Sequence, residues 1–335
     1  MQMRFVVRKE FFMIELYPLK LCGVTKSPIW GGERLARDWN KSASAPTIGE
    51  SWELTVRANE KCRIVNGDLG DRVLDEIIDL CGAAVTGGAF GVSDFPLLIK
   101  LIDAADDLSV QVHPDDTYAA RVENDRGKTE MWYIVEAEEG AELICGLADG
   151  VTREDYAKAV KAGDVMSALK RQRVRAGETY FIPAGLPHAI GKGILIAEIQ
   201  QNCDRTYRVY DYDRRQPDGS LRELHVEKAL EVIRPFSCEE IDAIRYAKAG
   251  QDYNRESLLA HCEFFRVEKL TVTNQAKVIS DGSMRHILCL AGAAKIFYDG
   301  EVYEVTRGDS WLIPASLADV TVSGNATVLL SSVGA

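Results

Sequence analysis

The stretch GETYFIPAGLPH at residues 177–188 decides the fold, because a close copy of it occurs later in the chain. Residues 308–319 read GDSWLIPASLAD, which matches it at the glycine, acid, aromatic, Ile-Pro-Ala and leucine positions. A repeat at a constant offset of 131 residues predicts the same structural unit in both halves of the chain. A chance match of Gly, Pro and Ala is the competing interpretation. The first copy ends in His188 and the second in Asp319, which favours one functional and one structural unit.

Short alternating segments bounded by Gly, Pro, Asp and Asn surround both copies. This density of short strands predicts an all-β sandwich or barrel core. The clearest segments lie at residues 49–56, 95–103, 130–137, 194–202 and 285–292. The expected fold class is therefore mainly β, with two β-barrel domains.

Two stretches have helical spacing of apolar residues instead. They are DRVLDEIIDLCGAAV at 71–85 and TREDYAKAVKAGDVMSALKRQ at 152–172. The second opens with a threonine cap and predicts a helix pair, inserted into the first domain at about 150–173. Because strand patterns resume after HVEKALEVIRPF, we expect the first domain to span 1–235 and the second 236–335.

The overall composition limits the possible partners and the compartment. The net charge of −11 over 335 residues argues against a nucleic-acid binder, which needs a basic surface. No apolar run approaches the roughly 18–20 residues that a membrane-spanning helix needs. The first twenty residues do not resemble a signal peptide. Eight cysteines without a CxxC pair fit a reducing cytoplasm.

Four residues in the first half of the chain form a candidate metal site. Gln111 and His113 lie two apart in SVQVHPDD at 109–116, so a strand would place both on one face. Glu130 opens the next strand, and His188 ends the repeated stretch. Each residue alone has an ordinary explanation, as a hydrogen-bonded structural histidine or a surface carboxylate. Their joint occurrence is what favours a metal site.

The pattern G-[acid]-x-x-x-x-P-A-G-x-x-H resembles the second metal motif of cupin barrels, in which the turn after the proline directs a histidine into the barrel mouth. Cupins take their other ligands from two upstream strands, where Gln111, His113 and Glu130 lie in this chain. Two imidazoles, a carboxylate and an amide suit Zn²⁺ and leave a position open for water or substrate.

Charged residues accompany these candidate ligands. Glu198 shares a strand face with apolar residues, so it is either buried in a polar network or lines a cavity. Lys100 interrupts an apolar strand, either as a lysine that reaches solvent at the sheet edge or as a pocket residue. Lys128 should share the face of Glu130, two residues on. Arg205 and Arg208 follow the Glu198 strand, and basic groups near a metal favour an anionic substrate.

Longer blocks resemble a known enzyme family, the short bacterial form of type I mannose-6-phosphate isomerase. The blocks are PIWGGERL at 28–35, GESWEL at 49–54, FPLLIKLIDAADDLSVQVHPDD at 95–116, GKTEMWYI at 127–134, FIPAGLPHAIGKG at 181–193, EIQQNCDRTYRVYDYDR at 198–214 and RELHVEKA at 222–229. This resemblance implies two cupin domains, the second without metal, and one Zn²⁺ per chain.

The resemblance also implies roles for individual residues. His113, Glu130 and His188 fall on the zinc ligands, and Gln111 occupies a further ligand position that varies within the family. Arg208 falls on the active-site arginine. Lysines that line the pocket correspond to Lys100 and Lys128.

Two assignments stay open at this stage. The proton-transferring group is Glu198, Lys128 or a metal-bound water, and the phosphate would meet Lys100, Ser109 or Arg205. His225 is expected to be structural or at the cleft rim. We assign no function to His261 and His286.

The implied reaction interconverts D-mannose 6-phosphate and D-fructose 6-phosphate through a cis-enediol. The partner would be a small phosphosugar, with no nucleic acid and no membrane, and the oligomeric state stays open. The competing interpretations are an isomerase for another phosphosugar such as glucose 6-phosphate, a non-catalytic metallo-cupin that binds sugar phosphates, and an iron oxygenase on the same ligands.

Overall fold

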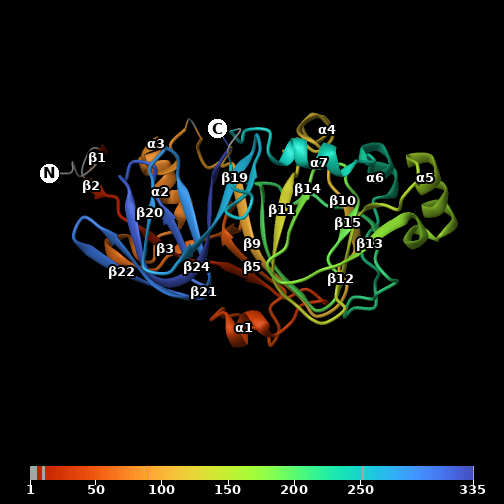
Figure 1. The fold of residues 1–335 in the computed structure, drawn as a ribbon, viewed down its shortest axis with the longest axis horizontal. Helices are drawn as coiled ribbons and strands as arrows, with labels where there is room; N and C mark the ends of the chain where they lie inside the picture. The colour runs from red at the N-terminus through yellow and green to blue at the C-terminus, as the bar shows by residue number, and fades with distance from the viewer. Residues whose placement is uncertain (1–5, 10–11, 89, 251–252, 335) are drawn as a thin grey trace.

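The computed structural model of the protein describes residues 6–9, 12–88, 90–250 and 253–334. Two mainly β units lie side by side, one formed largely by the middle of the chain and one largely by its C-terminal part (Figure 1). The predicted mainly β fold is confirmed. Across the described ranges, no helix is both long and apolar enough to cross a membrane.

The first unit is built from two antiparallel sheets. The six-stranded sheet has the order β14-β11-β16-β9-β5-β4, and the five-stranded sheet has the order β13-β12-β15-β10-β17. Their bounds are β4 Val24–Lys26, β5 Glu50–Leu54, β9 Leu97–Ala104, β10 Val110–Val112, β11 Glu130–Ala137, β12 Glu142–Leu147, β13 Leu169–Arg173, β14 Thr179–Ile182, β15 His188–Ala189, β16 Ile194–Gln201 and β17 Tyr207–Tyr210. An apolar core that includes Trp132, Leu143 and Ile196 draws on both sheets.

The second unit is one large sheet that curves around the largest apolar core, which it shares with the first unit. Its main order is β18-β19-β24-β21-β23-β3-β8, with β20 paired to β24 and β22 paired to β21. The bounds are β3 Leu19–Cys22, β8 Arg63–Ile64, β18 Leu258–His261, β19 Phe265–Val272, β20 Gln275–Val278, β21 Arg285–Tyr298, β22 Glu301–Thr306, β23 Ser310–Ile313 and β24 Val320–Val333. Strands β3 and β8 come from the N-terminal segment, so the sheet extends across the predicted boundary at residue 235.

The two units repeat one strand order. Strands β14-β11-β16-β9 of the first unit correspond to β23-β21-β24-β19 of the second. The repeated sequences supply β14 and β23, which start and end at matching positions of the two copies. The apolar core continues from one unit into the other, and the rings of Phe181 and Phe265 lie 6.0 Å apart where they meet.

The predicted helical stretch at 71–85 is confirmed, with one interruption. It forms α2 (Leu74–Cys81) and α3 (Ala83–Thr86), and Gly82 between them has a φ of +52°. Backbone hydrogen bonds from Ala315 and Ser316 to the carbonyls of Val85 and Ala84 attach this pair to the second unit.

The predicted helix pair at 152–172 is only half correct. Helix α5 (Arg153–Ala162) begins with a capping box at Thr152 and is followed by the 3₁₀ turn η2 (Val165–Ala168). The rest is strand β13, because it pairs with β12, where Gln172 lies opposite Leu143. Pairing with an available sheet edge therefore outweighs the helical spacing.

The remaining elements connect or flank the two units. They are β1 Val6–Lys9 paired with β2 Phe12–Glu15, β6 Val56–Arg57 paired with β7 Glu60–Lys61, η1 Gly67–Leu69, α1 Arg34–Asp38, α4 Asp116–Val122, α6 Val226–Val232 and α7 Cys238–Arg245.

Candidate active site

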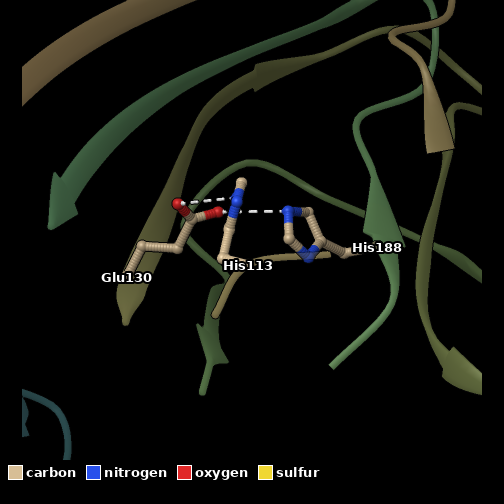
Figure 2. A group of neighbouring side chains, drawn as sticks. All are labelled: His113, Glu130 and His188. Atoms are coloured by element: carbon tan, nitrogen blue, oxygen red, sulfur yellow. Dashed lines mark ion pairs between the residues drawn. The ribbon is translucent and has the colours of Figure 1, made fainter. Parts of the chain in front are cut away.

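Three predicted ligands meet inside the first unit. His113 follows β10, Glu130 begins β11 and His188 begins β15, and all three are fully buried. The two carboxylate oxygens of Glu130 each face one histidine, with Oε2 3.6 Å from His113 Nε2 and Oε1 3.4 Å from His188 Nε2 (Figure 2). The potential ligand atoms all lie within 4.8 Å of one another.

The turn PAGLPH places the third of these residues. Gly185 has a φ of +93°, and an added Cβ would lie 2.9 Å from the carbonyl oxygen of Val232. Its N–H donates to the carbonyl of His113, which ties the turn to the end of β10. Strand β15, which follows the turn, pairs with β10, and Gln111 lies opposite His188 in that pair. The glycine is therefore needed at this turn to bring His188 to the other ligands.

Backbone carbonyls orient both imidazoles. His113 Nδ1 lies 2.9 Å from the carbonyl oxygen of Arg205, and His188 Nδ1 lies 2.8 Å from that of Leu186. With the proton on Nδ1, each Nε2 presents its lone pair to the centre of the site. Burial lowers the pKa of both histidines, that of His188 to about 4, so both rings are neutral at physiological pH.

The donor set fits a divalent metal. His188 Nε2 and Glu130 Oε1 are buried and have no hydrogen-bond partner within the part of the chain that the structure describes. Buried polar atoms without partners are costly, and a cation between them would satisfy both. Two imidazoles and one carboxylate are a common catalytic set for Zn²⁺, which leaves further positions for substrate or water.

An ammonium group lies beside this set. Lys128 Nζ is 2.8 Å from Glu130 Oε2 and 3.1 Å from His113 Nε2. Burial alone would lower the pKa of Lys128, but the charges of Glu130 and Glu198 outweigh it and raise the pKa. Lys128 therefore lies where its spacing from Glu130 predicts and keeps its positive charge.

A second carboxylate is held in a polar network on the same sheet. Glu198 Oε1 lies 3.2 Å from Lys100 Nζ, and Oε2 accepts a hydrogen bond of 2.9 Å from Trp132 Nε1. Burial by itself would raise the pKa of Glu198, but the positive charges of Lys100 and Lys128 together have the larger effect and lower it. Glu198 is therefore ionised. Lys100 is buried in the central strand β9 and not at a sheet edge, so the pocket alternative is correct for it.

A cavity of about 160 Å³ opens beside these groups. Six of the predicted site residues line it, namely Lys100, Ser109, Gln111, Lys128, Glu198 and Arg208. Arg208 Nε donates to Ser109 Oγ at 3.3 Å, and Nη1 donates to the carbonyl of Glu223 at 2.8 Å. Burial and the nearby Arg222 lower the pKa of Arg208, so an anion beside it is favoured.

The side chain of Arg205 lies outside this cavity. Its guanidinium faces two carboxylates, at 3.1 Å from Asp125 and 4.0 Å from Glu123, and it does not line the cavity. These acids hold the side chain outside the cavity, which disfavours the predicted contact with substrate phosphate. The contribution of Arg205 is its backbone carbonyl, which orients His113.

Two charged pocket residues were missed. Glu50 lies 4.0 Å from Lys100 Nζ, and Arg222 lines the same cavity. Arg222 donates two hydrogen bonds to the carboxylate of Asp211, from Nε to Oδ2 at 2.7 Å and from Nη2 to Oδ1. Both missed residues lie in the blocks GESWEL and RELHVEKA, so the family resemblance contained the signal.

The other histidines lie outside this cavity. His225 precedes α6, as its position at the start of HVEKALEV predicts, and its Nδ1 accepts from the backbone N–H of Arg208. His286 is buried in the second unit against Ser310. His261 ends β18.

Comparisons with known proteins identify the family. The model for the catalytic domain of type I phosphomannose isomerase matches residues 18–156, and that for the mannose-6-phosphate isomerase cupin domain matches 254–333. Mannose-6-phosphate isomerase ManA of Bacillus subtilis is 36% identical over 94% of this chain and 98% of its own. The chain belongs to the type I mannose-6-phosphate isomerase family.

Other relatives of this family agree. Mannose-6-phosphate isomerase of Streptococcus mutans is 34% identical over 94% of this chain and 98% of its own. The crystal structure of mannose 6-phosphate isomerase from Bacillus subtilis superposes with a TM-score of 0.82 at 32% identity, covering 94% of this chain and 99% of that one. The family and its cupin fold, which the sequence blocks predict, are thus confirmed.

Proposed function

We propose that the protein interconverts D-mannose 6-phosphate and D-fructose 6-phosphate with one Zn²⁺ held by His113, Glu130 and His188. The observation that carries this proposal is the convergence of the three buried donors beside a cavity lined by lysine and arginine. A cavity with this charge suits a phosphosugar. Membership in an isomerase family supports the same reaction.

Gln111 is the proposed fourth ligand. It lines the cavity and lies opposite His188 in the sheet, so its amide is on the side of the site that faces substrate. When bound, Zn²⁺ would act as a Lewis acid that polarises the sugar carbonyl and stabilises negative charge on its oxygen. This is the chemistry that a cis-enediol pathway needs.

The residues of the chain supply charge and proton transfer. The proton that moves between C1 and C2 needs an acceptor, and Lys128 cannot accept it because its pKa is raised. Glu198 is ionised and lines the cavity, so it is the better general base of the two. Arg208 keeps its charge and would stabilise the enediolate oxygens.

Phosphate binding is assigned to two other residues of the cavity lining. Lys100 and Ser109 line the cavity, and Ser109 is in hydrogen-bond contact with Arg208. We therefore assign the phosphate to Ser109 and Lys100 and exclude the side chain of Arg205. Within the described residues, none of the eight cysteines is in a disulfide, which supports a reducing compartment such as the cytoplasm.

The test is a coupled isomerase assay on the full chain before chelation, after chelation and after addition of Zn²⁺. The expected result is turnover of mannose 6-phosphate that disappears with the metal and returns with it. Activity that survives complete metal removal would contradict the metal site. Faster turnover of glucose 6-phosphate would assign a different substrate, and binding without turnover would indicate a sugar-phosphate binder.

A further inference from the structure

The second unit has a charged group at the position that corresponds to Glu130. In the first unit, Glu130 lies opposite Ile182 of the repeated stretch. In the second unit, Arg285 lies opposite Ile313, the matching isoleucine. Arg285 therefore takes the place of Glu130 in the sheet, and a carboxylate is replaced by a guanidinium.

The neighbouring strands follow the same correspondence. Glu130 lies opposite Gln200 on β16, and Arg285 lies opposite Ser332 on β24. Ser332 in turn lies opposite Arg266 on β19. Cross-strand partners share one face of a sheet. This row therefore directs two arginines and a hydroxyl toward one face of the second unit.

A cavity of about 320 Å³ lies over this row, a size within the range of small-molecule sites. Strands β19, β20, β21 and β24, which supply most of its lining, lie together in the second unit (Figure 1). Its polar lining includes Arg266, Lys277, Asp281, Arg285 and Ser332.

Arg285 is the buried charge of this cavity. The side chain is 2% exposed, and its Nη atoms donate to the backbone carbonyls of Val278 and Leu317 at 3.2 and 3.0 Å. Its Nε has no hydrogen-bond partner within the described residues. Burial of an incompletely paired guanidinium is costly, and an anion that accepts from it would lower that cost.

The other charges leave room for an anion. Arg266 and Glu268 neutralise each other through hydrogen bonds of 3.2 and 2.9 Å. Arg285 and Lys277 then face two carboxylates, Asp281 in the lining and Asp319 nearby. Each of these acids already accepts a backbone hydrogen bond, Asp281 from Ser283 and Asp319 from Ser280. A metal cation is disfavoured here, whereas an oxyanion is favoured.

Part of the lining is apolar. Leu270 and Leu330 lie in the wall, and Ile279 at the rim is 59% exposed. Such a wall suits a ligand with a short carbon skeleton better than a bare inorganic ion. The cavity thus combines oxyanion donors with apolar surface.

We propose that this cavity of the second unit binds a small organic oxyanion, a phosphate ester or a carboxylate, through Arg285, Ser332 and Lys277. This site is separate from the metal site of the first unit and does not depend on the proposed reaction. The two units of the repeat would then bind ligands of opposite charge at equivalent positions, a cation at Glu130 and an anion at Arg285.

Calorimetric titration of the full, zinc-loaded chain tests the proposal, with fructose 6-phosphate and malate as separate probes. Two variants change the cavity without removing the buried arginine: Lys277→Glu reverses an exposed charge, and Ser332→Leu fills the space beside Arg285. The control Arg255→Glu reverses an exposed arginine that pairs with Asp242 and does not line the cavity.

With at least one probe, the wild type and Arg255→Glu should bind one equivalent more than Lys277→Glu and Ser332→Leu. Mannose 6-phosphate turnover should be the same in all four proteins. The probe that binds distinguishes a phosphate ester from a carboxylate. Equal stoichiometry in all four proteins with both probes would overturn the proposal. An inactive chain that still shows the difference would disprove the proposed reaction and leave this site intact.

Discussion

The two units share a strand order but differ in the charged side chains at the ends of matching strands. In the first unit, the repeated stretch ends in His188, and the strand beside it begins with Glu130. In the second, the matching positions hold Asp319 and Arg285. The strand framework therefore tolerates opposite charges at one position, and the chemistry of each unit depends on a few side chains at the strand ends.

The largest expected effect comes from removing that difference. Glu130→Arg copies the second unit into the first and should abolish both metal binding and turnover, because a guanidinium repels a cation and cannot ligate it. The lost metal contribution is several kcal/mol of transition-state stabilisation, on the order of 10³-fold in rate or more. Metal analysis and the coupled assay measure it, and a variant that retains both would refute the site.

Glu198→Gln should retain metal and lose about 10³-fold in kcat, because an amide cannot accept the substrate proton. The side chain keeps its shape and its contact with Trp132. Its matched control is Leu330→Gln, at the corresponding position of the second unit, which should leave kcat unchanged. Near-normal turnover of Glu198→Gln would move the base to another group.

Arg208→Ala should keep metal and lose about 10²-fold in kcat, because the charge that stabilises the enediolate oxygens is removed. Arg208→Lys restores charge without the planar fork and should recover part of the loss. Full activity in the alanine variant would exclude a catalytic role.

Asp319→Ala tests whether the second copy of the repeat is structural. Asp319 Oδ1 accepts a 2.8 Å hydrogen bond from the backbone N–H of Ser280. Its loss should lower the free energy of unfolding by about 1 kcal/mol and leave kcat and metal content unchanged. Denaturant unfolding and the coupled assay report the two quantities. A fall in kcat would show that this region of the second unit is coupled to the candidate active site of the first.

The smallest effect is expected for Arg205→Ala. Its backbone carbonyl still orients His113, and its side chain contacts only Asp125 and Glu123, so KM and kcat should change by less than about twofold. A large rise in KM for mannose 6-phosphate would restore Arg205 to the substrate pocket.

The sequence predicted which three residues meet in the candidate site but not every side-chain direction. His113, Glu130 and His188 were found because period-two spacing and the PAGLPH turn are local properties. The sequence position of Arg205 near the site does not reveal the two acids that hold its side chain outside the cavity. The strand at 169–173 was missed because its formation depends on the free edge of β12, a contact distant in the sequence.

We infer that one unit of the repeat, and not both, is the metal enzyme. Titrating Zn²⁺ into the metal-free chain while following isomerase turnover tests this directly. Activity should rise to a plateau at one equivalent of bound zinc per chain, and His188→Ala should bind none at this site and remain inactive. A plateau at two equivalents, or full turnover in His188→Ala, would contradict the claim.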